Sequence, residues 1–190
     1  MQTAEKRYSE KEYLARERVR DVRHEFVEGV EYAMAGASRA HSDLQQNLVV
    51  LLRAAVRSSG CNVGGPDQRV QPGARYYYPD LVGYCGSGND DGFHTLRDAR
   101  LIIEVLSAGT EAADRGEKFE AYASLQSLVE YVLVDSRRMR VERFLRQPDG
   151  SWRLDAFGPG ASVHLTAFDV ELSIDALYEG VTLEPALRLL

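Results

Sequence analysis

The stretch Leu101-Ile102-Ile103-Glu104-Val105-Leu106 decides the fold of this chain. Five aliphatic residues around one acid predict a buried strand over residues 100–106, at the centre of a sheet that is covered on both faces. A carboxylate in such a strand is costly unless it has a partner, a proton or a metal. Glu104 is therefore the first candidate site residue.

The chain before this strand predicts a helix, a hairpin and a second helix. Ser9-Glu10-Lys11-Glu12 fits a capping box, which predicts a short helix over 9–20, and residues 24–34 alternate around a Glu28-Gly29 turn. Ser38 can cap a long amphipathic helix with leucines at three- and four-residue steps. Strands are expected at 67–71 and 77–84, and the glycine-rich segment 85–98 is expected to be a mobile loop.

The chain after this strand predicts a helix and then a β-meander. The helix starts at Thr110 or Asp114, strands follow at 129–135, 139–145 and 151–157, edge strands at 162–165 and 170–172, and a short helix at 173–178. We therefore predict one domain over residues 1–190 of the α/β (α+β) class. It has a mixed central β-sheet flanked by helices, an N-terminal helix and hairpin, and a C-terminal β-meander.

Composition limits the function classes. The 190 residues are 44% hydrophobic and 27% charged, with a net charge of −6, which argues against disorder and against a general nucleic-acid-coating protein. No apolar stretch reaches the ~18 residues of a spanning helix, so we expect a cytoplasmic protein without a membrane partner. Cys61 and Cys85 lack zinc-ligand spacing, and we expect both to be reduced thiols.

A basic run near the meander allows two interpretations. The run from residue 137 to residue 146 contains a single acid, Glu142. Its arginines are Arg137, Arg138, Arg140, Arg143 and Arg146. An exposed β-ribbon kept soluble by arginines is the favoured interpretation, and a DNA contact is the alternative.

A metal site is predicted between two neighbouring strands. Asp80 stands at the start of an apolar strand and is the nearest upstream acid to share a site with Glu104. Mg²⁺ or Mn²⁺ takes a few carboxylate oxygens plus water, and the main-chain carbonyl of Val105 could supply a third protein oxygen. Lys118 would orient the attacking water or offset charge on a phosphate.

Each of these residues also has a purely structural explanation. Pro79-Asp80 is a common turn dipeptide, and Lys118 stands four residues after Asp114, where a surface ion pair would account for it. Four further residues are weaker site candidates, because a place in the local structure explains each of them equally well. They are Glu31, His41, Asp67 and Ser107.

Six motifs together resemble a known family over nearly the whole chain. They are Glu25-Phe26-Val27-Glu28-Gly29, Asp67-Gln68-Arg69-Val70, Tyr78-Pro79-Asp80, Glu104-Val105-Leu106-Ser107, Asp114-Arg115-Gly116-Glu117-Lys118-Phe119 followed by Tyr122, and Glu130-Tyr131-Val132-Leu133-Val134-Asp135. This pattern is similar to the Uma-type family of restriction-endonuclease-like proteins. The resemblance implies a PD-(D/E)XK core that cleaves DNA with Mg²⁺, in which Asp80 and Glu104 match the two acids. Leu106 stands where that core has its lysine, and the resemblance implies that Lys118 replaces the lysine in space.

Two functions of different classes follow. The first is a Mg²⁺-dependent endonuclease that hydrolyses DNA phosphodiester bonds, acting as a homodimer because two active sites related by a two-fold axis can cut both strands. RNA or branched DNA is a weaker alternative substrate. The second is a catalytically degenerate nuclease-fold protein that serves as a nucleic-acid or protein interaction module. The missing in-strand lysine and the acidic charge are the support for the second, and the endonuclease is the preferred interpretation.

Overall fold

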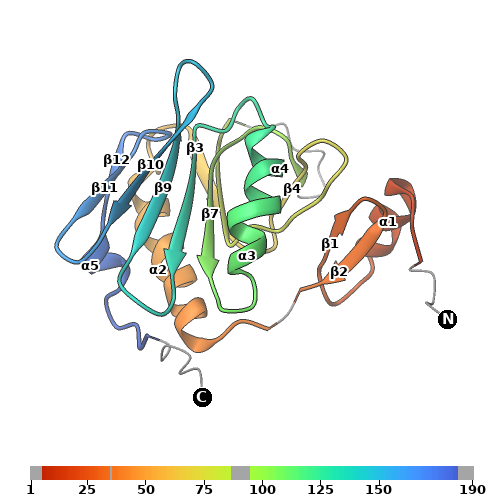
Figure 1. Ribbon diagram of the computed structural model, residues 1–190, viewed down its shortest axis with the longest axis horizontal. Helices are drawn as coiled ribbons and strands as arrows, with labels where there is room; N and C mark the ends of the chain where they lie inside the picture. The colour runs from red at the N-terminus through yellow and green to blue at the C-terminus, as the bar shows by residue number, and fades with distance from the viewer. Residues whose placement is uncertain (1–5, 35, 87–94, 184–190) are drawn as a thin grey trace.

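A six-stranded mixed sheet forms the centre of the protein. The computed structural model describes residues 6–34, 36–86 and 95–183 (Figure 1). The strand order is β10-β9-β8-β7-β5-β3, and within this sheet β7 and β8 run parallel while the other neighbours are antiparallel. The strands are β3 (Cys61–Gly64), β5 (Leu81–Cys85), β7 (Ala99–Leu106), β8 (Glu130–Asp135), β9 (Val141–Arg146) and β10 (Trp152–Phe157). The predicted mixed sheet and its C-terminal meander are confirmed.

The central strand β7 divides its side chains between two hydrophobic cores. Leu101, Ile103 and Val105 pack in the core under α2 (Arg39–Ala55), together with β11 (Ser162–Leu165), β12 (Val170–Ser173) and α5 (Ile174–Leu177). Ile102 and Leu106 pack in the opposite core, against α4 (Phe119–Ala123). Side chains alternate along a strand, so Glu104 faces α4. None of the helices in the described ranges has the length and apolar character that crossing a membrane requires.

The N-terminal segment forms a small unit beside the sheet (Figure 1). Helix α1 (Glu10–Glu17) begins with the predicted capping box at Ser9, and β1 (His24–Val27) pairs with β2 (Val30–Ala33) as the predicted hairpin. Phe26 forms a β-bridge with Tyr76. Both aromatic residues pack with Tyr13, which holds the hairpin against the main body.

Several predicted elements differ from those observed. The expected edge strands β11 and β12 pair with each other in a separate two-stranded sheet, and the segment 85–98, expected to be a loop, contains a short strand at 95–96. Strand β5 begins at Leu81 rather than residue 77, since proline at 79 has no amide for the ladder. The expected strand at 67–71 is reduced to β4 (Arg69–Val70), which pairs with β6 (Thr95–Leu96). The predicted helix is α3 (Glu111–Ala113), a π-helical turn η1 (Asp114–Lys118) and α4 in succession. Residues 87–94 of the predicted loop lie outside the described residues.

The cysteine prediction was wrong. Cys61 and Cys85 form a disulfide, because the antiparallel register of β3 and β5 places them directly opposite each other. Their Cα atoms are 3.9 Å apart. The two residues are separated by 24 positions in sequence, so only the strand pairing brings them together.

The arginine run is not a simple exposed ribbon. Arg143 is buried, contacts the carbonyl of His164 and donates to Asp155 at 2.7 Å. Arg146 donates to the carbonyls of three residues at the end of the α4 core, namely Ala123, Leu125 and Leu128. These two arginines therefore stabilise the end of the sheet, and the ribbon prediction was wrong for them.

Candidate active site

A pocket of about 630 Å³ lies near the carboxyl end of β7. Its walls come from the N-terminal hairpin, the first turns of α2, the residue before β5, the turn after β7 and η1. Residues predicted from sequence line it, namely His41, Asp80, Glu104, Ser107 and Lys118, together with Glu25, Gln45 and Asp114. The fold therefore gathers residues from five separate segments at one place.

Asp80 and Glu104 hold each other through main-chain hydrogen bonds. The Asp80 amide donates to Glu104 Oε2 at 3.2 Å, and the Val105 amide donates to Asp80 Oδ2 at 2.6 Å. Leu81 pairs with Ile103 in the ladder, so the residue just before β5 lies beside Glu104. Both carboxylates are buried. The sequence placed these two acids on neighbouring strands, and the structure brings them together.

Two side chains of α2 fix the orientation of the Asp80 carboxylate. His41 Nε2 lies 2.8 Å from Asp80 Oδ1, and Gln45 Nε2 donates to the same oxygen at 2.6 Å. Residues four apart share one face of a helix, so both reach the acid from one side. Gln45 was missed in the sequence, although its spacing from His41 could have indicated it.

Lys118 is a half-buried ammonium held by three carboxylates. Its Nζ lies 3.0 Å from Glu25 Oε1, 3.3 Å from Asp114 Oδ1 and 3.4 Å from Glu104 Oε1. The side chain is 13% exposed, so a surface ion pair with Asp114 does not describe it. Glu25 and Asp114 were not predicted as site residues. Glu25 could not be recognised, because the hairpin that carries it is far from Lys118 in sequence.

A π-helical turn sets the direction of Lys118. Asp114 and Lys118 bound the turn, and the Tyr131 hydroxyl donates to the Asp114 carbonyl at 2.9 Å. The Tyr122 hydroxyl donates to Glu104 Oε1 at 3.1 Å from the next turn. Such turns are rare and often occur at functional sites.

Burial and crowding shift the pKa values of the pocket. Burial raises the pKa of Glu104 well above its usual value; Lys118 opposes this, while Asp114 and Asp80 add to it. Burial also raises the pKa of Asp80, against the lowering effect of His41. Burial alone would lower the pKa of Lys118, but Glu104, Glu25 and Asp114 raise it well above the usual value. The pocket thus holds more acidic than basic side chains, and their crowding around one ammonium shifts the pKa values of Asp80, Glu104 and Lys118.

Three weaker candidates have local partners. Glu31 forms ion pairs with Arg16 at 3.2 Å and with Arg20 at 2.8 Å, and Asp67 is paired with Arg23 at 3.0 Å, so neither lines the pocket. Ser107 does line it, and its Oγ accepts from the Thr110 amide at 3.3 Å. The structure therefore brings His41 and Ser107, but not Glu31 and Asp67, to the site.

The donor set fits a hard divalent cation. In the described ranges no group of three or more His, Cys, Asp and Glu side chains is arranged as a metal site. Mg²⁺, however, is usually held by one or two carboxylates together with waters and substrate phosphates. Asp80 Oδ2 and Glu104 Oε2 each accept one described hydrogen bond and have two lone pairs. The buried excess of carboxylates also favours a cation.

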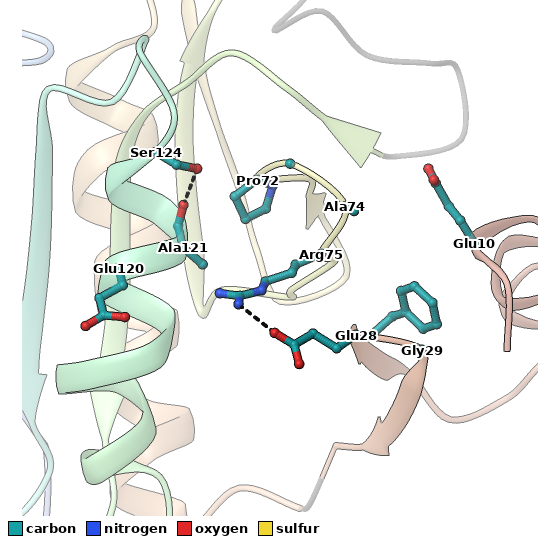
Figure 2. Close-up of a pocket in the computed structure, with 11 residues that line it drawn as sticks. Glu10, Glu28, Gly29, Pro72, Ala74, Arg75, Glu120, Ala121 and Ser124 are labelled. Carbon is teal, nitrogen blue, oxygen red and sulfur yellow. Dashed lines mark hydrogen bonds and ion pairs between the residues drawn. The ribbon is translucent and has the colours of Figure 1, made fainter. Parts of the chain in front are cut away.

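A second pocket, of about 570 Å³, lies between the hairpin, residues 72–75 and α4. Figure 2 shows Arg75 pointing toward Glu28, with Nη2 3.2 Å from Glu28 Oε1. None of the predicted site residues lines it. This ion pair helps to fix the hairpin that carries Glu25.

The chain is similar to known proteins over most of its length. Residues 10–177 match the model of the Uma2 family, described as "Putative restriction endonuclease". Two uncharacterized proteins of Synechocystis sp. (strain ATCC 27184 / PCC 6803 / Kazusa), slr1290 and sll1609, are each 30% identical, over 91% and 82% of this chain and 92% and 90% of their own lengths.

A solved structure shares the fold. It is a crystal structure of "a putative nuclease belonging to DUF820" from Anabaena variabilis ATCC 29413, with a TM-score of 0.75 and 17% identity, covering 92% of this chain and 99% of that chain. The likeness shows a common mixed α+β fold with a central sheet flanked by helices. By its sequence match, this chain belongs to the Uma2 family of restriction-endonuclease-like proteins.

Proposed function

We propose that this protein is a Mg²⁺-dependent endonuclease that hydrolyses DNA phosphodiester bonds in the pocket between Asp80, Glu104 and Lys118. The observation that carries the proposal is the meeting of two buried carboxylates with the half-buried Lys118 ammonium, 3.4 Å from Glu104, at the carboxyl end of the central strand. Membership of a family described as restriction endonucleases supports a nuclease.

The residues divide the work by their chemistry. Asp80, Glu104 and the Val105 carbonyl would hold the ion. When bound, a Mg²⁺ or Mn²⁺ ion lowers the pKa of water and offsets charge on a phosphate. The Lys118 ammonium carries a fixed positive charge into the pocket, where it would stabilise the negative charge that develops during attack at phosphorus.

The supporting side chains would keep this arrangement ready before substrate binds. His41 and Gln45 fix the Asp80 carboxylate, while Tyr122 donates to Glu104. Ligand side chains that are held by neighbours need little reorganisation, which favours both ion binding and catalysis. Lys118 also supplies the positive charge that Leu106 cannot, which weakens the case for a degenerate interaction module.

Plasmid nicking by the purified protein with Mg²⁺ or Mn²⁺ tests the proposal. We expect nicking by the wild type and a loss of about 100-fold or more in Asp80→Asn and Glu104→Gln, because each removes a charged oxygen ligand. Asp169→Asn is the matched control, since Asp169 lies outside the pocket at a positive φ of 57° that asparagine tolerates.

Full nicking activity in both site variants would show that the pocket does not catalyse the reaction. Calorimetric titration with Mn²⁺ distinguishes the endonuclease from a degenerate interaction module, because the module gives no heat of metal binding. RNA and branched DNA in the same assay identify the preferred substrate. Sedimentation with and without DNA tests the proposed homodimer.

A further inference from the structure

A chain of alternating charges extends from the pocket along the β8–β9 turn. It runs in the order Arg138, Asp135, Arg137, Glu111, Arg115, Glu142, Arg140. The distances include 2.8 Å from Arg138 to Asp135, 2.6 Å from Arg137 to Glu111 and 2.7 Å from Arg140 to Glu142. We call these seven residues the arginine ladder. Four arginines and three acids give it a net positive charge in a protein of net charge −6.

The arginine ladder lies next to the pocket, although none of its seven residues is among those that line it. Asp135 pairs with Leu106, two residues after Glu104, and Ser136 Oγ donates to the Leu106 carbonyl at 2.7 Å. Arg115 follows Asp114, whose carboxylate contacts Lys118. The ladder therefore begins at the carboxyl ends of β7 and β8, where the pocket also lies.

Two acids of the arginine ladder are buried and its end arginines are exposed, while the third acid, Glu111, is 28% exposed. Asp135 and Glu142 side chains are 3% and 8% exposed, whereas those of Arg138 and Arg140 are 63% and 42% exposed. At its two ends the ladder therefore presents guanidinium groups to solvent and to any partner. A layered arrangement of this kind presents positive charge although the charges nearly balance.

Both end arginines have side-chain donors beyond those used in the described hydrogen bonds. Among the side-chain hydrogen bonds of the described residues, Arg138 and Arg140 each donate from Nε alone, and a guanidinium has five N–H donors. The two Nη groups present a planar edge that matches phosphate oxygens. The acid at Nε fixes the direction of that edge, so little side-chain entropy is lost on binding.

We propose that the arginine ladder is a docking surface for the phosphate backbone of nucleic acid next to the cleavage pocket. The inference rests on the proposed nuclease function, because it names the surface that would hold the substrate of that site. The rest of the protein is acidic and repels phosphate, so a local positive edge would also set the position of the strand.

Binding of a fluorescent DNA duplex of about 30 base pairs, in EDTA so that cleavage is blocked, tests the proposal over a series of salt concentrations. For the double variant Arg138→Gln/Arg140→Gln we expect affinity to fall about 10-fold and the salt slope to fall by about 0.9 for each phosphate that the protein no longer neutralises. Arg153→Gln is the control. Arg153 pairs with Asp155, two residues further along β10, and lies toward the end of β10 that is away from the β8–β9 turn.

The outcomes separate this inference from the proposed function. A reduced affinity and salt slope in the double variant alone supports the ladder, even if no nicking occurs. Equal affinities and slopes for wild type and double variant overturn it, even if nicking is intact. Binding of an acidic polypeptide but not of DNA also overturns it, because the partner is then a protein. Unfolding temperatures of all three proteins show that any change is not a loss of fold.

Discussion

Glu25 and Lys118 are held 3.0 Å apart, although one lies in the N-terminal hairpin and the other in the π-helical turn beyond the central strand. The hairpin therefore contributes directly to the candidate active site. It is attached through the bridge between Phe26 and Tyr76, so the position of Glu25 depends on contacts outside the pocket.

Replacing Glu25 with glutamine should slow nicking by about 10- to 100-fold, as is typical when a supporting partner of a metal site is removed. The side chain keeps its shape, but Lys118 loses one of three carboxylates. Single-turnover nicking measures the effect. Glu171→Gln in β12 is the control, since Glu171 is 63% exposed and lines neither pocket. A Glu25→Gln protein that is folded and as fast as wild type would contradict the role.

Substituting Gln45 with leucine should raise the Mg²⁺ concentration needed for half-maximal nicking by about 10-fold. The change keeps the helix but removes the 2.6 Å hydrogen bond that orients Asp80. Gln46→Leu provides the neighbouring control, because Gln46 is exposed and contacts only the carbonyl of Ser42 among its described hydrogen bonds. An identical metal dependence for all three proteins would show that Asp80 needs no such support.

Changing both Cys61 and Cys85 to serine should lower the free energy of unfolding by about 3 kcal/mol, because the bridge closes a loop of 24 residues in the unfolded chain. Denaturant unfolding gives the value, with dithiothreitol-treated wild type as a second reduced form. Nicking should persist, since Cys85 lies at the end of β5 remote from Asp80. Two titratable thiols in the untreated protein would show that the bridge does not form.

Asp135→Asn should weaken the pH dependence of stability in acid. Burial alone would raise the pKa of Asp135, but hydrogen bonds from Arg137 and Arg138 lower it below 3.8 overall. A lowered pKa stabilises the fold above pH 3.8, and that contribution is lost as pH falls through the folded-state pKa.

We expect wild type to be about 1–3 kcal/mol more stable than Asp135→Asn at pH 7, because the variant leaves the guanidinium groups of Arg137 and Arg138 without their buried charged acceptor. The difference should shrink in acid. Urea unfolding at pH 7 and at about pH 3 measures both values. Asp169→Asn, at an exposed position, is the control. A difference independent of pH would show that the charge of Asp135 is not what matters.

The order of helices and strands was readable in the sequence because local patterns control it. The apolar run at 101–106 required a central strand, the serines at 9 and 38 cap the helices they were expected to cap, and Glu28-Gly29 makes the hairpin turn. Glu104 was recognisable as a site candidate because it lies inside the apolar run, where burial of an unpaired carboxylate is unfavourable.

The tertiary structure alone decided which side chains share the pocket. Lys118 lies 3.4 Å from Glu104 because a π-helical turn points it there, and no sequence spacing specifies that turn. Glu25, Gln45 and the Cys61–Cys85 bridge depend on how distant segments pack and on strand register. Periodicity is a property of neighbours along the chain, whereas a site is made of atoms brought together by the burial of separate faces in common cores.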